Sequence, residues 1–335
     1  MTYEQVRKEA RSKMTLCSSC TVCNGAACGS RMPGPGCKGS GKVAKRNYDA
    51  WQDILLNLDT IGVEQEPDTT LNLWNHIFTY PIFAAPMGVV QPHFGELYPQ
   101  DEYDSILVRG CCDSGIAAFT ADGLEPHYFV GGCDAIKNNG FGIPTIKPRN
   151  WEVVREKIDA AKERGVSVLC MDIDAAGLPF LKHNNPPSGR KTVDELRRII
   201  EYADMPFILK GIMTADGARK ALDAGVDAIV VSNHGGRVLD STPATAWVLN
   251  EIAEAVGNDI TILVDGGIRS GLDVFKALAL GADAVLIGRP FASCIYGGRE
   301  DGIRAFVSQI GSELKDTMQM CGVNALSEIG MHNLW

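Results

Sequence analysis

One apolar run ends in a cluster of side chains that could carry out proton transfer and carboxylate binding. The run AIVV stops at Val231 and is followed by Ser232, Asn233, His234, two glycines and Arg237. Histidine transfers protons readily near neutral pH, and the guanidinium fork of arginine matches a carboxylate. The glycines leave space for a ligand, which weakens the alternative that His234 is a structural histidine. The cluster therefore predicts a site for a substrate that carries a carboxylate and a proton to be removed.

Two segments nearer the C-terminus have the composition of a phosphate-binding site. In VDGGIRSG, Gly266 and Gly267 come directly after an apolar run and before an amphipathic stretch, and VLIGRP places Gly288 and Arg289 in the same way. Glycine lets backbone N–H groups approach an anion, and the N-terminus of a helix adds a favourable dipole. Arg269 and Arg289 could then pair with phosphate oxygens. The alternative is that the glycines only form tight turns.

A lysine ends another apolar run. Lys210 closes PFILK, and an ammonium group at the end of a buried strand needs a partner. We expect it to place positive charge beside an electron-rich cofactor ring. A solvated lysine at a strand end is the alternative.

The elements that must position these residues recur along the chain. Eight short apolar runs lack polar alternation and are mostly separated by amphipathic, Ala/Glu/Lys-rich stretches, which is typical of parallel βα units. The runs lie at 81–85, 115–119, 142–146, 166–171, 206–210, 227–231, 260–264 and 283–287. Eight units favour an α/β fold of the closed (β/α)₈ barrel type over an open doubly wound sheet. Because active sites of such barrels lie at the C-terminal ends of the strands, the residues that follow the runs should converge on one face.

The first 46 residues differ from the rest and predict a short Cys/Gly-rich appendage to a barrel of residues 47–335. Within it Cys17, Cys20, Cys23 and Cys28 have the two- to four-residue spacing of thiolate metal sites. Such spacing suits zinc or an iron–sulfur cluster. Reduced thiols in a flexible arm, or redox-sensitive thiols, are the alternative, and the other cysteines of the chain are expected to be packing residues.

Composition excludes several classes of partner. The formal net charge of −9 argues against binding to nucleic acid or to an anionic membrane surface. No apolar run approaches the roughly 20 residues that span a bilayer, and the charged N-terminus has no apolar signal region. We therefore expect a cytoplasmic protein with a small-molecule substrate.

The motifs VVSNHGGRVLD, LKGIMTADGARKALDAG and LVDGGIRSGLDVFKALALGADAVLIGRP resemble the FMN-dependent α-hydroxy acid oxidases and dehydrogenases, the glycolate and lactate oxidase family. The resemblance is dense over 206–291 and traceable over 47–175. It implies a (β/α)₈ barrel that binds FMN and oxidises the C2 alcohol of a 2-hydroxy acid to a keto group. It also implies a homo-oligomer, because members of the family often form tetramers.

The resemblance implies a role for each matching residue. His234 would be the catalytic base with Asp172 beside it, Arg237 would bind the substrate carboxylate, and Lys210 would lie near N1 of the flavin. Together with the strand-end positions, it assigns FMN binding to Ala85, Pro86, Met87, Gly88, Thr120, Lys210, Ser232, His234, Asp265, Gly266, Gly267, Arg269, Gly288 and Arg289.

The sequence departs from this family in the substrate half of the site. A tyrosine expected near the N-terminus is replaced by the region of Met32 to Gly34, and a second one, after the third strand, by a region that contains Lys147. An arginine expected after the fourth strand is absent, with Lys182, His183 or Arg190 as possible replacements. Two other hypotheses therefore stand beside a 2-hydroxy acid oxidoreductase. One is a redox-neutral FMN-dependent isomerase, like the type 2 isopentenyl diphosphate isomerases, and the other is a flavin- and metal-binding electron carrier or sensor.

Overall fold

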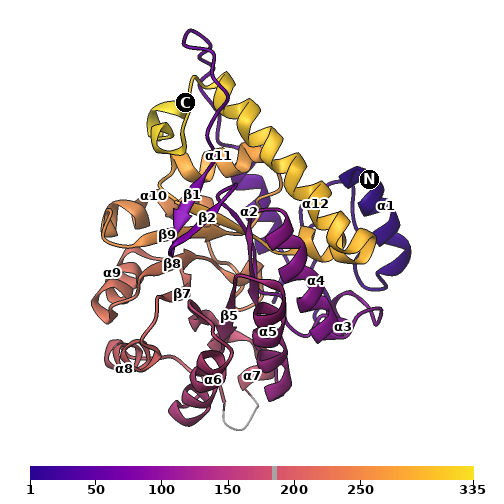
Figure 1. The fold of residues 1–335 in the computed structure, drawn as a ribbon, viewed down its shortest axis with the longest axis vertical. Helices are drawn as coiled ribbons and strands as arrows, with labels where there is room; N and C mark the ends of the chain where they lie inside the picture. Colours follow the sequence, from indigo (N-terminus) through magenta and orange to yellow (C-terminus); the bar gives the residue numbers. More distant parts are fainter. Residues whose placement is uncertain (183–186) are drawn as a thin grey trace.

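Eight parallel strands form a closed barrel, as the sequence predicts (Figure 1). The computed structural model describes residues 1–182 and 187–335. The barrel order is β10-β3-β4-β5-β6-β7-β8-β9, so each strand lies beside its neighbour in the chain and β10 closes the ring against β3. The strands are β3 (Ile82–Ala84), β4 (Ala117–Thr120), β5 (Gly142–Ile146), β6 (Leu169–Asp172), β7 (Phe207–Ile212), β8 (Ala228–Val231), β9 (Thr261–Asp265) and β10 (Ala284–Ile287).

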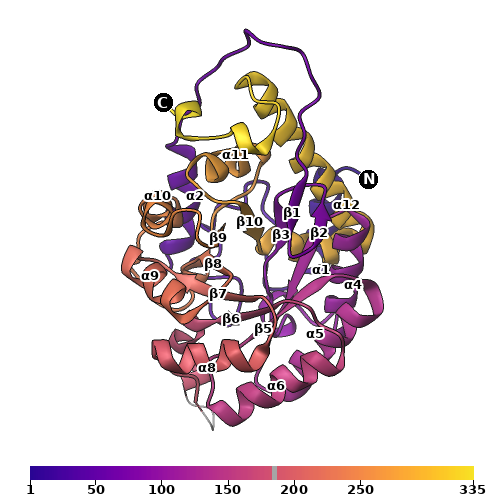
Figure 2. The ribbon, with the colours of Figure 1, turned by 60° about the vertical axis from the view of Figure 1, so that its left-hand side comes forward.

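Helices surround the barrel and bury the outer face of its strands (Figure 2). They are α4 (Gln100–Asp113), α5 (Pro126–Asn139), α6 (Trp151–Glu163), α8 (Val193–Ala203), α9 (Ala215–Ala224), α10 (Thr245–Val256), α11 (Gly271–Ala279) and α12 (Arg289–Met320). Two short helices, α3 (Gln91–Phe94) and α7 (Pro179–Lys182), lie in the segments that follow β3 and β6. The largest apolar cluster lies between this shell and the strands, and a second fills the barrel. Because apolar side chains cover both faces of each strand, the strand sequences show no polar alternation.

A hairpin that the sequence patterns did not predict covers one end of the barrel. Strands β1 (Leu71–Leu73) and β2 (His76–Phe78) pair in antiparallel fashion, and Phe78 packs with the side chains inside the barrel. The chain runs from β2 directly into β3, so the hairpin lies at the N-terminal end of the barrel strands. The opposite, C-terminal end is left for the functional residues.

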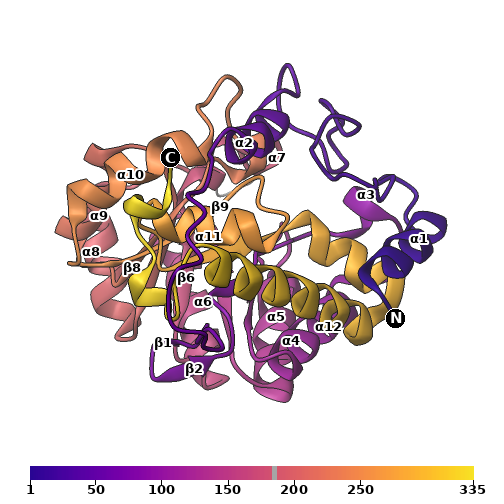
Figure 3. The ribbon, with the colours of Figure 1, turned by 90° about the horizontal axis from the view of Figure 1, so that it is seen from above.

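The N-terminal segment packs on the barrel. Helix α1 (Tyr3–Lys13) lies against α12, which Figure 3 shows at one side of the molecule. Loops follow up to α2 (Val43–Gln52), and the boundary predicted between residues 46 and 47 lies inside this helix. Lys38 donates its backbone N–H to the carbonyl of Gly236. The appendage therefore reaches the loop that carries His234 and Arg237.

Across residues 1–182 and 187–335, no helix has the length and apolar character needed to cross a bilayer.

Candidate active site

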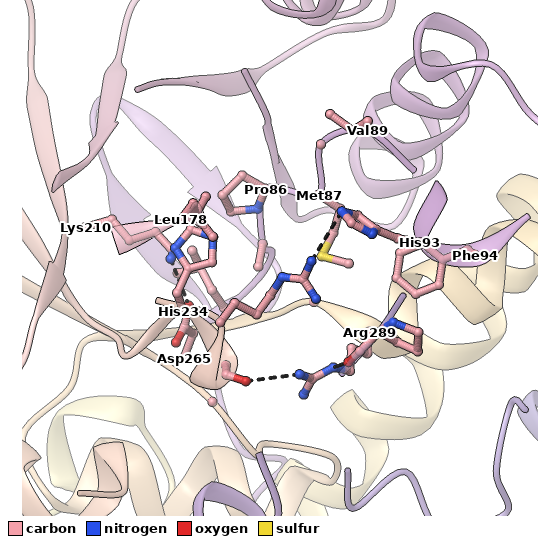
Figure 4. A pocket seen from close by; sticks show the side chains of 18 of the residues that line it. Pro86, Met87, Val89, His93, Phe94, Leu178, Lys210, His234, Asp265 and Arg289 are labelled. Atoms are coloured by element: carbon pink, nitrogen blue, oxygen red, sulfur yellow. Dashed lines mark hydrogen bonds and ion pairs between the residues drawn. The ribbon is translucent and has the colours of Figure 1, made fainter. Parts of the chain in front are cut away.

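A cavity lies at the C-terminal ends of the strands, where the barrel predicts it (Figure 4). Its lining combines apolar side chains with a few charged ones, as is usual for small-molecule sites. The sequence-predicted residues that line it are Ala85, Pro86, Met87, Gly88, Lys210, His234, Arg237, Asp265, Gly266, Gly267, Arg269, Gly288 and Arg289. Of the others, Asp172 and Thr120 are the buried last residues of β6 and β4, and Ser232 directly follows β8. Of the residues suggested to replace the missing arginine, His183 and the side chain of Lys182 lie outside the described part of the chain, and Arg190 does not line the cavity.

The partner of His234 differs from the one expected. His234 opens a short 3₁₀ turn, η2 (His234–Gly236), and its Nδ1 lies 3.0 Å from Oδ1 of Asp174. The sequence placed Asp172 in that position; Asp172 does lie within 4.8 Å, but its own oxygens face lysines. Asp174 follows β6 in the turn η1 (Ile173–Gly177), which extends the chain toward His234. With Nδ1 held by Asp174, Nε2 is the nitrogen left for a substrate.

Buried charges alternate around the barrel mouth. The ammonium of Lys210 lies 3.0 Å from Oγ of Ser232, 3.3 Å from Oδ2 of Asp265 and 3.4 Å from Oδ1 of Asp172. Asp172 also pairs with Lys147, whose Nζ lies 2.5 Å from Oδ2. Burial opposes ionisation of both Asp172 and Lys210, but the neighbouring opposite charges outweigh it. The pKa of Asp172 is therefore held below, and that of Lys210 above, its ordinary value.

The guanidinium groups of Arg237 and Arg289 lie close enough for the charge of Arg289 to lower the pKa of Arg237. Burial, and then the charge of Arg289, lower the pKa of Arg237 to about 10. Nη1 of Arg237 donates to the carbonyls of Gly34 and Gly36, at 2.8 and 2.9 Å. Arg289 donates to the carbonyls of Pro35 and Gly235. Neither guanidinium has a carboxylate partner among residues 1–182 and 187–335, so both are suited to bind anions.

The predicted phosphate turn is fixed by its neighbours. Gly266 and Gly267 have φ values of 94° and 88°, which glycine adopts without strain, and a side chain at Gly267 would collide with the backbone of Asn47. The side chain of Asp273 accepts the backbone N–H of Arg269, so α11 starts directly behind this turn.

The four N-terminal thiols approach one another less closely than a zinc site requires. In the described part of the chain, the one group of three potential metal ligands within 4.8 Å of each other is Asp172, Asp174 and His234. Zinc–sulfur bonds of about 2.3 Å would bring tetrahedral thiolates to about 3.8 Å. Burial raises the pKa of Cys17 to about 12, and the charges of Cys20, Cys23 and Cys28 also act on it. The four thiols therefore lie in the same region of the N-terminal segment.

Comparison with known proteins identifies the family. A family model described as FMN-dependent dehydrogenase matches residues 35–185 and 180–335. A peroxisomal (S)-2-hydroxyacid oxidase of Arabidopsis thaliana is 48% identical over 320 residues, which cover 84% of this chain and 85% of that protein. The chain belongs to the FMN-dependent dehydrogenase family.

Solved structures agree with this placement. A mandelate oxidase variant with a monooxide FMN adduct has a TM-score of 0.76 and 26% identity, covering 90% of this chain and 92% of that one. A lactate oxidase of Pediococcus acidilactici has a TM-score of 0.81 over 100% of this chain and 94% of that one; at 23% identity it supports the fold alone.

The cavity fits the cofactor of this family. Among the residues that line the cavity, Asp265 has a buried oxygen, Oδ1, that lacks a hydrogen-bond partner within the described chain. Unpaired buried polar atoms are costly unless a ligand satisfies them. The guanidinium of Arg289, beside Gly288, donates to two carbonyls but has no carboxylate partner among the described residues, so it matches a phosphate. Asp265 therefore suits the polar ring or ribityl chain of the cofactor, and Arg289 suits its phosphate.

Three contributors to the site are not predicted from the sequence. The resemblance favours Asp172, the last residue of β6, over Asp174, which stands two residues further along the chain. Lys147 stands in the region of the missing tyrosine, and its ion pair with Asp172 has no signal in the sequence. His93 lies on α3, a four-residue helix with no periodic signal, and lines the cavity.

We expect Asp174→Asn to slow flavin reduction about 10- to 100-fold while FMN stays bound. Asp174 acts as a positioning residue, and a charge-assisted hydrogen bond contributes about 1.5–3 kcal/mol. Stopped-flow absorbance measures the rate, with Asp216→Asn on exposed α9 as control. An unchanged rate would show that Asp174 does not support His234.

Proposed function

We propose that this protein is an FMN-dependent oxidoreductase that converts the C2 alcohol of a 2-hydroxy acid to a keto group. One observation carries the proposal: His234, held by Asp174 through Nδ1, lines the same cavity as Arg237 and Lys210. A base, a carboxylate-binding fork and a buried cation are the groups that this oxidation needs. The identity to a plant (S)-2-hydroxyacid oxidase supports it.

The roles follow from the chemistry of the groups. Oxidation of the alcohol breaks one O–H and one C2–H bond and releases two electrons and two protons. FMN, when bound, supplies a two-electron acceptor. His234 takes one proton at Nε2, either from the hydroxyl or from C2, and Asp174 stabilises the imidazolium that forms. Arg237 orients the acid through its carboxylate, and Lys210 supplies positive charge where negative charge develops.

Anaerobic mixing of the purified flavoprotein with a panel of 2-hydroxy acids tests this function. Bleaching of the flavin with formation of the 2-oxo acid is the expected result. Product without net bleaching would favour the redox-neutral isomerase instead. That chemistry has no evident need for the arrangement of His234 and Arg237, so we retain it only as the second candidate.

We further propose that Cys17, Cys20, Cys23 and Cys28 bind an iron–sulfur cluster, which would accept electrons from the flavin singly. Four arginines donate to backbone carbonyls of the segment 16–23: Arg7 to Cys20 and Thr21, Arg11 to Ser19, Arg31 to Leu16 and Arg269 to Cys23. None has an ion-pair partner among the described residues, so their charge is available to balance thiolates. A cluster of several iron and sulfide atoms also spans wider thiol spacing than one zinc ion.

This cysteine site predicts bound iron. Protein purified without oxygen should contain iron and sulfide, and Cys17→Ser/Cys20→Ser should lose both while keeping FMN, as measured by metal analysis and flavin absorbance. Cys112→Ser, on α4, is the control. Zinc alone, or no metal, would refute the cluster, and with it the hypothesis of a dedicated electron carrier.

Assembly and location are also proposals. We propose a homo-oligomer, supported by the exposed side chains of Leu58, Ile61 and Val63 in the loop between α2 and β1, which Figure 2 shows extending beyond the barrel. Light scattering of wild type and Ile61→Glu would measure the oligomeric state.

We propose a cytoplasmic location, supported by eleven free cysteines, which suit a reducing compartment. Cell fractionation would test it.

A further inference from the structure

His93 has two hydrogen-bond donors facing its ring and only one nitrogen that can accept. Its Nδ1 accepts the backbone N–H of Gly34 at 3.1 Å, and its Nε2 lies 3.2 Å from Nη2 of Arg237 (Figure 4). Burial, and then the charge of Arg237, lower the pKa of His93 to about 4, so the ring is neutral near pH 7. A neutral imidazole has one N–H and one acceptor nitrogen, whereas arginine only donates. One of the two contacts therefore brings two N–H groups face to face.

An anionic oxygen beside Nε2 would remove this conflict. With Nδ1 accepting from Gly34, Nε2–H and Nη2–H of Arg237 can both donate to one oxygen. Among residues 1–182 and 187–335, Arg237 has no anionic partner, and its Nη1 donates to the carbonyls of Gly34 and Gly36. Charge-assisted bonds to a carboxylate are stronger than bonds to neutral carbonyls.

A second cavity continues from this point. It shares His93, Val89 and Phe180 with the first cavity. Most of its lining is apolar: Met32, Pro33, Val89, Pro92, Leu124, Pro179 and Phe180. A ligand held by its carboxylate at His93 could extend an apolar chain into this space.

We propose that His93 and Arg237 together bind the carboxylate of the substrate, and that the substrate is a 2-hydroxy acid whose extended apolar side chain fills the second cavity. The proposal rests on the function proposed above. His93 takes over the position of a second carboxylate ligand, for which the sequence offers neither the tyrosine nor the arginine of its relatives. It also explains how Arg237 acts without those helpers.

Binding of phenylacetate to the oxidised holoenzyme tests, without turnover, whether His93 and Arg237 bind a carboxylate. This acid has no hydroxyl to oxidise, and its binding can be followed by the flavin difference spectrum. His93→Ala should weaken phenylacetate about 10- to 100-fold and leave the neutral 2-phenylacetamide within about threefold, because only the acid presents an anion. His93→Gln retains an N–H donor and should recover most of the affinity. Gln91→Ala, on the same short helix, is the control.

A series of 2-hydroxy acids tests the side-chain cavity. From lactate to 2-hydroxyoctanoate, KM should fall about fourfold per methylene group with little change in kcat. Leu124→Trp should raise KM for 2-hydroxyoctanoate and spare lactate. His93→Ala should raise KM for the whole series and change kcat less.

The outcomes separate this inference from the proposed function. If His93→Ala loses equal affinity for phenylacetate and 2-phenylacetamide, His93 does not bind the carboxylate. If KM is independent of chain length, the second cavity does not bind the substrate side chain. If no hydroxy acid bleaches the flavin, the proposed function fails, whereas binding of phenylacetate still decides the role of His93.

Discussion

Flavin reduction by substrate should fall about 10²- to 10⁴-fold in His234→Asn, while FMN remains bound. This range is the usual contribution of a positioned general base. Asparagine is close to histidine in size and cannot take a proton at neutral pH. The backbone N–H of residue 234 can still donate to Ser232, so the turn that carries it should persist. Anaerobic stopped-flow absorbance gives the rate, and the flavin-to-protein absorbance ratio gives the cofactor content.

The control for this variant is His332→Asn, an exposed histidine in the C-terminal turn η4 (Met331–Asn333). It should reduce flavin at the wild-type rate. A single-turnover rate in His234→Asn equal to that of wild type would exclude His234 as the base, and loss of FMN would show that the histidine mainly supports the cofactor.

The barrel and most of the cavity were predictable because their signals are local. Each strand is buried on both faces, so runs such as DAIVV and DAVLI are continuously apolar, and the residue after each run must reach the C-terminal face. Asp265 directly follows the run ITILV, so its position follows from that rule, whereas Lys210 lies inside β7 and His234 lies three residues beyond Val231. The hairpin β1–β2 was not predictable in this way, since its two strands have three residues each and no clear alternation.

The contacts between distant segments were not predictable from the sequence. The choice between Asp172 and Asp174 depends on the path of the turn η1, which the residue types do not determine. The contact of Arg237 with Gly34 and Gly36 joins positions about 200 residues apart in the chain, and no periodic pattern relates them. Packing of the N-terminal segment on the barrel thus decides the substrate half of the site, where the resemblance to known relatives is weakest.

Replacing Lys210 with methionine should cost about 3–5 kcal/mol of unfolding free energy, because it leaves Asp265 buried without its cation. Asp172 keeps Lys147, so Asp265 is the carboxylate most affected. Urea unfolding of the holoprotein measures the loss. Lys210→Met/Asp265→Asn should recover part of it, since the uncompensated charge is removed. Lys220→Met, which breaks an exposed pair with Asp216, should cost less than about 1 kcal/mol.

The pH dependence of stability should identify the same network. The folded pKa of Asp172 lies below its unfolded value of about 3.9, so its contribution is present above that pH and is lost as pH falls through the folded pKa. The folded pKa of Lys210 lies above its unfolded value of about 10.4, so its contribution is present below that pH and is lost as pH rises through the folded pKa. In Lys210→Met the alkaline loss due to this lysine should disappear, and the acidic loss should shrink because Asp172 then has one cation instead of two. An acid and alkaline profile parallel to that of wild type would mean that Lys210 is not coupled to these carboxylates.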